Sequence, residues 1–571
     1  MSASTLAGIE RWYLRAGLFV LPLAFAWFTY DQYVLPKLLI ARLLLLGLLV
    51  LFVARAAVSG HVQVKRTPLD LPLLAFVGSG VLSTLFAENQ NVAIFGTYSR
   101  YDGLLTLVTY AGLFWLVVQA LPTAAEGHNL LRFLLASGYV VAVIAILQAV
   151  GDTVRQGEVV PAFGSLGNSN VLGAFLAMVF ALACHELITA RSIGARVMVV
   201  NLLIVVGLAL LLSFSRSAWL GTAIGGVIVV VGARANISRG AVGVVAGGVV
   251  AAALVLLLLN ATGFELERRL LARGLTLFNP SEWGGSRLHI WLDSVRVIAS
   301  RPLVGYGPDN FGLVFPRFET GDWGVGIRDI HQQVDKAHAE TLQVAATQGL
   351  LGLAAYAWVV IAFVLSFWTA RGREGALGLL AAFVAYQVTI QPNFTALAAA
   401  FPFWILAAAA MVLFEAAPPW RTFAIPRRGL RLGISSVMVA SLVALSIPLV
   451  VFPLVADTQL RLALDALSRG DRDAGWELAA RAASLAPQES VYRVEVANVA
   501  IDRHDLPAAR LAYLEAVRLG TYNPFVYRNL ALVDVQLGRR AEALSAARMA
   551  VELNRFDPAN QALVAQLEAP P

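Results

Sequence analysis

Long apolar stretches separated by short polar ones make up most of this chain. The stretches are continuous, and many reach the ~20 residues that a helix needs to cross a bilayer. A spanning β-barrel would show alternating apolar and polar residues instead. The pattern therefore predicts an all-α, polytopic membrane protein with about 12–13 spans. The predicted spans are 16–30, 36–58, 69–86, 103–121, 130–150, 170–190, 196–213, 217–232, 240–260, 340–367, 375–391, 395–416 and 431–455.

Composition agrees with this pattern and narrows the class of protein. Of the 571 residues, 58% are hydrophobic and 14% are charged. Soluble domains have about 45–50% apolar and about 25% charged residues, so the excess must face lipid. A cytosolic enzyme, a disordered scaffold and a secreted disulfide module are excluded. The single cysteine, Cys184, also excludes an intrachain disulfide and a multi-cysteine metal site.

The loop charges predict the orientation. Cytoplasmic loops carry the excess of Lys and Arg, whereas long loops cross the membrane regardless of charge. A cytoplasmic N-terminus gives the best bias, with a retained first helix because no small-residue cleavage site follows it. The long loop at about 261–339 and everything after the last span then lie outside. The inside residues are Arg11, Arg15, Arg55, Lys65, Arg66, Arg132, Arg191, Arg196, Arg234, Arg239, Arg371, Arg373, Arg421, Arg427, Arg428 and Arg431, against Lys37, Arg100, Arg155 and Arg216 outside.

The chain changes to a soluble, helical composition near residue 457. Units from Gly470 to Pro487, Asp505 to Pro524 and Gly538 to Pro558 repeat at about 34–37 residues and resemble tetratricopeptide repeats. Such a stack leaves a concave groove, which favours a docking surface for a protein partner; a stabilising cap is the alternative. Three domains are predicted: a membrane domain (1–416), a linker with an extra span (417–456) and a repeat domain (457–571). Residues 418–428 would form a cytoplasmic linker.

Four polar clusters face outward on this topology: 164–170, 213–217, 284–287 and 335–343. Arg216 lies between two predicted spans, and an ionisable residue at a membrane edge is a functional candidate. An arginine reaching out to lipid headgroups is an equal alternative. Residues 284–287 indicate a flexible turn that opens an amphipathic helix.

The order of these motifs resembles the O-antigen ligase superfamily. That superfamily includes O-antigen ligases, glycan polymerases and oligosaccharyltransferases that O-glycosylate proteins. The resemblance covers roughly 1–416. Its motifs here are Leu35-Pro36-Lys37, Gly96–Arg100 with Asp102-Gly103, Gly167–Asn170, Ser215-Arg216-Ser217, Ser286-Arg287, Pro302-Leu303 with Gly305, Gly307 and Phe311, Asp335 with His338, and Gly349–Gly352.

The resemblance implies a transferase of the bacterial inner membrane with its site on the outer side. Its donor would be a glycan on undecaprenyl pyrophosphate, and its acceptor a lipid, glycan or protein hydroxyl. Carried over by position, Arg216 and Arg287 match the essential arginines and His338 the essential histidine. Many members have Asn after that histidine, where this chain has Ala339. No cofactor, metal or nucleic acid is implied.

The residue types suit that chemistry. Arginine binds phosphate oxygens through paired N–H donors. A neutral histidine can take the proton of an attacking hydroxyl. With one candidate base and no obvious carboxylate nucleophile pair, we expect a single displacement that inverts the anomeric carbon.

Several residues keep two interpretations. Asp335 is expected to orient His338 or pair with Lys336, and Glu340 and Asn168 are further supporting candidates. Asn168 and Asn170 cap a helix or touch substrate, with capping favoured. A metal site is the rival reading, because His331, Asp335 and His338 would share one helix face. Asp471-Arg472-Asp473 is interpreted as a solvated turn.

Other functions remain as alternatives. Within the transferases, ligase-type transfer is favoured over protein O-glycosylation and polymerisation. No P-loop occurs, which fits a donor that carries its own activation. A transporter of lipid-linked glycans and a membrane-anchored scaffold are the remaining classes. Two observations count against a transporter: the chain shows no pair of matching interrupted helices in two halves, and its polar residues gather on one side of the membrane.

Overall fold

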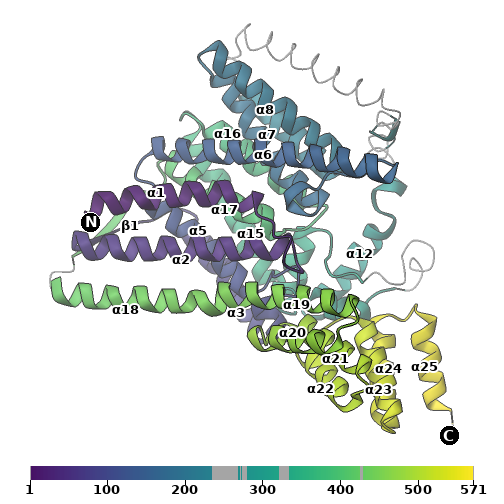
Figure 1. Ribbon diagram of the computed structural model, residues 1–571. Helices are drawn as coiled ribbons and strands as arrows, with labels where there is room; N and C mark the ends of the chain where they lie inside the picture. Colours follow the sequence, from purple (N-terminus) through teal and green to yellow (C-terminus); the bar gives the residue numbers. More distant parts are fainter. Residues whose placement is uncertain are drawn as a thin grey trace.

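The computed structural model describes residues 2–233, 268–270, 272, 280–320, 333–424 and 428–569. It is a helical bundle followed by a smaller helical array (Figure 1). Six of the described helices are long and apolar enough to cross a membrane, and five shorter apolar helices accompany them. The prediction of an all-α polytopic protein is confirmed.

Most helices of the bundle follow the predicted apolar stretches, but Gln90–Phe95, Pro280–Ser300 and Phe311–Val314 form helices in predicted loops. The centre of the bundle is α17, Leu397–Leu413, in which every residue is buried. Span 240–260 lies outside the described residues. The other bundle helices are α1 (Ala3–Val20), α2 (Val34–Ser59), α3 (Asp70–Leu85), α4 (Gln90–Phe95), α5 (Leu104–Ala120), α6 (Ala124–Gln156), α7 (Ser169–Thr189), α8 (Ile193–Leu212), α9 (Arg216–Gly232), α12 (Pro280–Ser300), α13 (Phe311–Val314), α15 (Glu340–Ala370), α16 (Ala376–Ile390) and α18 (Arg428–Ser446).

The first predicted span, 16–30, is misplaced. Helix α1 begins at Ala3, because the Ser2 side chain accepts a hydrogen bond from the backbone N–H of Thr5. After the 3₁₀ turn Leu21–Leu23, which contains a proline, the chain leaves the helix. Lys37 is also no loop cation. It is fully buried, and its Nζ donates to the backbone carbonyls of residues 24, 33 and 165 at 2.6–2.9 Å.

The predicted linker 418–428 contains a strand. β2 (Pro419–Ala424) pairs antiparallel with β1 (His61–Lys65), with His61 opposite Ala424. Hydrophobic patterning did not indicate either strand, because both are short and exposed or half-exposed. The pairing brings two loops that were predicted to be cytoplasmic to one end of the bundle.

The repeat array grows out of the last span without a loop. Helix α18 continues through a π-helical turn, Ile447–Val451, into α19 (Phe452–Ser468), so the predicted boundary at 456/457 falls inside a helix. Consecutive helices of the array pack against one another. Asp471 caps α20 by accepting from the Ala474 N–H at 3.0 Å. Arg472 and Asp473 already belong to the first turn of that helix, so the solvated turn predicted at 471–473 is correct only at Asp471. The array continues as α20 (Arg472–Leu485), α21 (Ser490–Asp502), α22 (Leu506–Arg518), α23 (Pro524–Gln536), α24 (Arg540–Leu553) and α25 (Pro558–Glu568).

The array packs against the end of the bundle that carries α12 (Figure 1). The Asn91 side chain donates to the carbonyls of Gln488 and Leu519 at 2.9 and 3.0 Å. The Asp457 carboxylate accepts from the backbone N–H of Asp31 at 2.9 Å and from the Tyr98 hydroxyl. One edge of the predicted docking domain is therefore covered by the chain's own loops.

Candidate functional site

His338 lies where the polar loop meets α15, two residues before that helix begins. Its backbone has φ of 47°, in the left-handed region that few residues other than glycine adopt. Its carbonyl accepts from the Trp291 Nε1 at 3.0 Å, and its ring centroid lies 5.4 Å from that of Phe394. A strained backbone held on both sides fixes the imidazole in one position.

The imidazole is set up to be neutral. Burial and the Arg287 guanidinium lower the pKa of His338 to about 4, against a smaller opposing effect of Asp335. Its Nδ1 is buried and has no hydrogen-bond partner among the described residues. A neutral imidazole with an unpaired nitrogen can take a proton from a molecule that enters the site.

Arg287 lies on α12 and is half-buried. Its Nη1 donates to the Pro392 carbonyl at 2.9 Å, in the turn between α16 and α17. The helix around it already begins at Pro280, so the flexible turn predicted at 284–287 is wrong. The helical phase of α12 instead fixes the direction in which Arg287 leaves the backbone.

Arg216 is the first residue of α9. The preceding Ser215 does not cap that helix with its side chain; its Oγ donates to the Asn170 Oδ1 at 2.9 Å. A helix N-terminus that begins with an arginine favours an anion. Asn168 caps the neighbouring α7 by accepting from the backbone N–H groups of Asn170 and Val171, so the favoured capping role is confirmed for Asn168. It is wrong for Asn170, which is the second residue of that helix.

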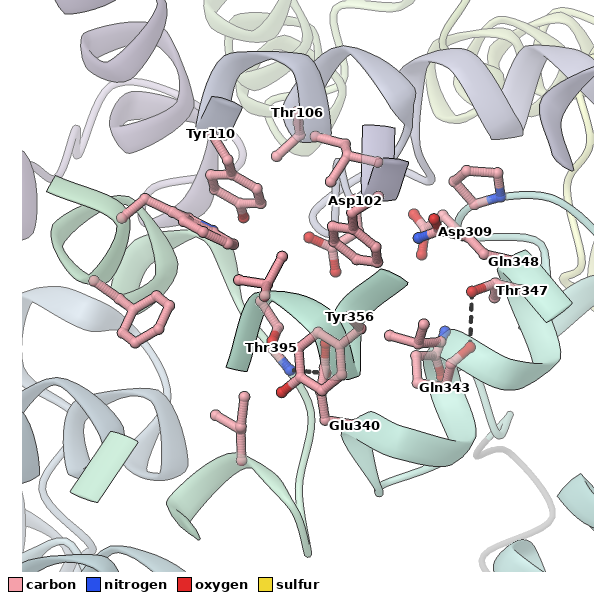
Figure 2. A pocket seen from close by; sticks show the side chains of 18 of the residues that line it. Asp102, Thr106, Tyr110, Asp309, Glu340, Gln343, Thr347, Gln348, Tyr356 and Thr395 are labelled. Atoms are coloured by element: carbon pink, nitrogen blue, oxygen red, sulfur yellow. Dashed lines mark hydrogen bonds between the residues drawn. The ribbon is translucent and has the colours of Figure 1, made fainter. Parts of the chain in front are cut away.

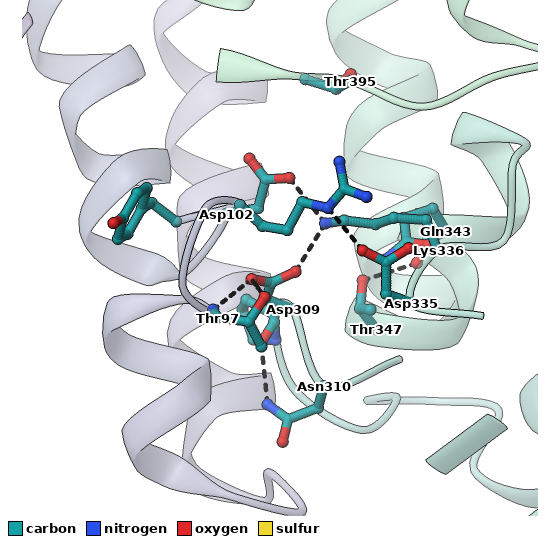
Figure 3. A network of polar contacts seen from close by, with 12 residues as sticks. Thr97, Asp102, Asp309, Asn310, Asp335, Lys336, Gln343, Thr347 and Thr395 are labelled. Carbon is teal, nitrogen blue, oxygen red and sulfur yellow. Dashed lines mark hydrogen bonds and ion pairs between the residues drawn. The ribbon is translucent and has the colours of Figure 1, made fainter. Parts of the chain in front are cut away.

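Asp335 does not pair with Lys336. Its carboxylate accepts from the Arg100 Nε at 2.6 Å (Figure 3). The same guanidinium lies 5.1 Å from the Phe394 ring centroid. Nor does a helix hold Asp335 and His338 on one face, because α15 starts only at Glu340. The helical spacing that suggested a metal site is therefore wrong at these two residues, and His331 lies outside the described residues. The residues that the structure describes contain no group of three His, Cys, Asp or Glu side chains placed to hold a metal ion.

Lys336 points to the other side of the loop. Its Nζ lies 2.7 Å from an oxygen of Asp102 and 2.7 Å from one of Asp309 (Figure 3). Burial by itself would lower the pKa of Lys336, but the two carboxylates together raise it above its usual value. Asp309 also accepts from the Thr97 backbone N–H at 2.7 Å. A buried, charged cluster therefore joins the loop before α5 to the loop that carries His338.

The glycine-rich segment 302–307 inserts into a break in α15. Gly349 has φ of 69° and interrupts the helix there. The Gly307 and Tyr306 N–H groups donate to the carbonyls freed at Thr347 and Ala346, at 2.8 and 3.1 Å. A Cβ on Gly305 would lie 2.5 Å from the Thr347 backbone, so only glycine allows this approach.

A cavity of about 100 Å³ lies beside the charged cluster (Figure 2). Asp102, Lys336 and Glu340 line it. The buried hydroxyls of Tyr110 and Tyr386 also line it and have no hydrogen-bond partner among the described residues. The volume holds several waters, and those hydroxyls give water something to bind.

Glu340 ties α15 to the α16–α17 turn. Its Oε2 accepts from the Thr395 backbone N–H at 2.7 Å (Figure 2). The turn also carries Phe394, which contacts His338, and Pro392, which accepts from Arg287. Glu340 therefore fixes the α16–α17 turn near His338, just as Asp335 fixes Arg100.

Comparison with known proteins adds an independent observation. Residues 201–357 match the family model described as O-Antigen ligase. This confirms the resemblance that the motifs predicted, and the matched O-antigen ligase segment contains Arg216, Arg287, Asp335 and His338. The search of curated proteins finds no match. A crystal structure of the APC/C hetero-tetramer Cut9-Hcn1 is similar at 10% identity and a TM-score of 0.19, with 81% of this chain and 90% of that one covered; so low a score carries no argument.

Residues outside the O-antigen ligase segment complete the site. Arg100, Asp102 and Phe394 contact Asp335, Lys336 and His338 respectively, yet none was singled out as a site residue from the sequence. Arg100 and Asp102 stand in a motif that supported the resemblance, which was the available signal. Phe394 follows a polar Gln-Pro-Asn turn between two apolar spans, and no spacing connected it to a histidine some 56 positions earlier (338 to 394).

Proposed function

We propose that this protein transfers a glycan from undecaprenyl pyrophosphate to an acceptor hydroxyl on the outer side of the bacterial inner membrane. The observation that carries the proposal is the neutral, half-buried His338 near Arg287, within a segment that matches the O-antigen ligase family. Membrane helices and the matched family support a membrane glycosyltransferase in general; donor, acceptor and mechanism are this proposal's own.

His338 acts as the general base. As the acceptor oxygen forms its bond to the anomeric carbon, its proton passes to an imidazole nitrogen. The bond from that carbon to the pyrophosphate oxygen breaks, and its electron pair leaves with the pyrophosphate. The leaving group is already stable as an anion and needs charge stabilisation, which Arg287 and Arg216 supply through charge-assisted hydrogen bonds.

The transfer inverts the anomeric carbon. A retaining route by double displacement needs a carboxylate as nucleophile, and the two carboxylates closest to His338 in the sequence are both engaged, Asp335 with Arg100 and Glu340 with the Thr395 N–H. Product with retained anomeric configuration would contradict this step.

Ligase-type transfer to a lipid or surface glycan is the favoured acceptor class. The repeat array packs against the loops around the site, so it limits what can approach from that side. Protein O-glycosylation and polymerisation are the alternatives within the same chemistry. A transporter or scaffold would bind the lipid-linked glycan without releasing undecaprenyl pyrophosphate.

Purified protein in detergent tests the proposal. We would supply undecaprenyl-pyrophosphate glycan with lipid, glycan and protein acceptors separately, and measure released undecaprenyl pyrophosphate and product mass. His338→Asn should lower the rate by about 10²–10⁴, the usual contribution of a general base. His504→Asn is the matched control, because His504 is exposed and also has a positive φ, 62°, which asparagine tolerates.

The outcomes separate the functions. Transfer to one acceptor that is lost in His338→Asn and kept in His504→Asn supports the proposal and names the acceptor. Equal rates in the two variants would overturn His338 as the base. Binding of the donor without release, with every acceptor, would favour the transporter or scaffold.

A further inference from the structure

A second, larger cavity lies at the end of the bundle opposite the candidate site, where the N-terminus and β1 are found (Figure 1). Its volume is about 680 Å³, and the ends of α1, α2, α5 and α17 surround it with the β1–β2 sheet. Helix α2 runs from the site end to this end, and its 26 residues span about 39 Å. No step of glycan transfer uses this cavity.

Cationic side chains gather at the cavity. Arg11, Arg55 and Lys65 line it. Arg11 and the neighbouring Arg15 share one carboxylate, that of Glu126. Two guanidinium groups on one carboxylate leave positive charge uncompensated.

Arg55 and Lys65 repeat that imbalance. The Arg55 Nε lies 3.2 Å from the Glu10 carboxylate, which is 1% exposed. The Lys65 Nζ donates to the Leu121 backbone carbonyl and has no carboxylate at ion-pair distance among the described residues. Burial and the nearby Arg55 lower the pKa of Lys65, so its charge is held at a cost that a bound anion would relieve.

The charge balance in and around the cavity stays positive when the nearby carboxylates are counted as well. Glu415 lines the cavity but pairs with Arg373. Arg11, Arg15, Arg55, Lys65 and Arg373 therefore face Glu10, Glu126 and Glu415, an excess of two positive charges.

At the rim of the cavity, next to the lining residue Pro419, β2 carries an aromatic residue of the kind found at membrane surfaces. Trp420 of β2 is 47% exposed. The guanidinium carbons of Arg66 and Arg421 lie 4.7 and 4.8 Å from its ring centroid. Tryptophan collects at the headgroup level of a bilayer, and basic clusters there attract anionic lipids.

We propose that this cavity binds the phosphodiester headgroup of an anionic membrane phospholipid. The cationic side chains hold the phosphate, and the apolar lining residues Phe52, Ala56 and Val412 accept the adjoining part of the lipid. The volume falls within the roughly 300–1,000 Å³ of small-molecule sites. Basic pockets between membrane helices are known positions for anionic headgroups. Free phosphate shares this chemistry, and the Trp420 rim favours the lipid.

The test uses the full-length protein in neutral detergent and does not require transfer activity. Phosphatidylglycerol or phosphatidylcholine is added to the micelles, and the thermal unfolding midpoint and lipid adducts in native mass spectra are recorded. A ligand of the folded state raises the midpoint in proportion to its occupancy. We expect phosphatidylglycerol to raise it and phosphatidylcholine to leave it unchanged.

Variants locate the effect. Lys65→Gln with Arg55→Gln should weaken phosphatidylglycerol binding by about tenfold or more, since each removes a charged hydrogen-bond donor. Lys65→Arg keeps the charge and should keep binding. Arg371→Gln is the matched control: Arg371 is exposed beyond the last turn of α15 and does not line the cavity.

Three results would overturn the proposal. One is equal stabilisation by both lipids. Another is unchanged phosphatidylglycerol binding in the Lys65→Gln, Arg55→Gln double variant. The third is full stabilisation by inorganic phosphate or glycerol 1-phosphate with no further effect of the lipid, which would make the cavity a site for soluble anions.

Discussion

At the scale of single residues, the site is a set of charges held by burial. His338 stays neutral because it is half-buried and lies near the Arg287 guanidinium, while Lys336 stays charged because two carboxylates surround it. These neighbours in sequence point to different sides of the loop, so one is available to substrate and the other anchors the backbone. The backbone of His338 has a positive φ, where the chain turns between these two directions.

The first residue-scale prediction concerns pH. The proposed base, His338, works only when neutral, so kcat/KM should be flat at neutral pH and fall as pH drops through about 4, the pKa of His338 in the free protein. Bound pyrophosphate is negative and should raise this pKa, which moves the acid limb of kcat to higher pH. Rates measured from pH 4 to 8 test this.

Arg287→Gln offers a check on the same prediction. It removes a cation that lowers the His338 pKa, so the acid limb of kcat/KM should move upward. An acid limb that stays in place while the rate falls would mean that Arg287 acts on the donor alone.

The second residue-scale prediction concerns Lys336. Lys336→Met leaves the buried Asp309 and the half-buried Asp102 without their cation, which should destabilise the fold by about 3–5 kcal/mol. Arg155→Ala, which breaks an ion pair whose arginine is 73% exposed, should cost at most about 1 kcal/mol. Thermal unfolding midpoints of the two variants in detergent give the comparison. Equal midpoints would contradict the anchoring role.

At the scale of elements, the broken helix α15 links the glycine motif to the histidine. The break at Gly349 frees carbonyls, and the segment 302–307 supplies the N–H groups that satisfy them. The first part of α15 thereby takes a fixed position, and His338 stands just before it. The segment 302–307, which the sequence indicates as a turn, thus connects the loop after α12 to the break in α15 through hydrogen bonds.

The element-scale prediction is a glycine substitution. A Cβ on Gly349 would lie 2.1 Å from the Leu303 carbonyl oxygen, and its φ of 69° disfavours side chains. Gly349→Ala should therefore cost more than about 1–2 kcal/mol and lower transfer activity. Gly226→Ala in α9 meets nothing within 4 Å and should leave stability unchanged or slightly raised. Unfolding midpoints and transfer rates are measured for both variants. Similar losses of stability and activity in the two would contradict the role of the Gly349 break in fixing α15.

At the scale of the whole molecule, the repeat array is part of the site's support. Arg555 donates to the Pro316 carbonyl at 2.9 Å, and Arg317 pairs with Glu552 at 2.9 Å. The Tyr98 hydroxyl donates to Asp457 of the array. Tyr98 lies two residues before Arg100, which pairs with Asp335. Removing the array would therefore disturb loops on which the candidate base depends.

The whole-molecule prediction tests that support. Asp457→Ala leaves the Asp31 N–H and the Tyr98 and Tyr492 hydroxyls without their acceptor, at about 1–3 kcal/mol each for those that stay buried. We expect a lower unfolding midpoint and a lower transfer rate. Asp465→Ala in the same helix is the control. Asp465 is 43% exposed, and its ion pair with Arg461 is weak because the two atoms lie 3.7 Å apart. Activity that survives Asp457→Ala unchanged would separate the array from the site.

The sequence by itself determined the membrane class, the helical spans and the repeats, because continuous apolar runs and local periodicity act over neighbouring residues. Ordered motifs in the sequence also led to the prediction of Arg287 and His338 as site residues. The sequence could not assign Asp335 to Arg100 or Lys336 to Asp102, since those ion pairs join loops more than 230 positions apart.

Only the tertiary structure decided those pairings. Buried charges take the partners that packing brings within reach, whatever their separation in the chain. The same holds for the β1–β2 pairing, the break in α15 and the cationic cavity, each of which needs distant segments side by side.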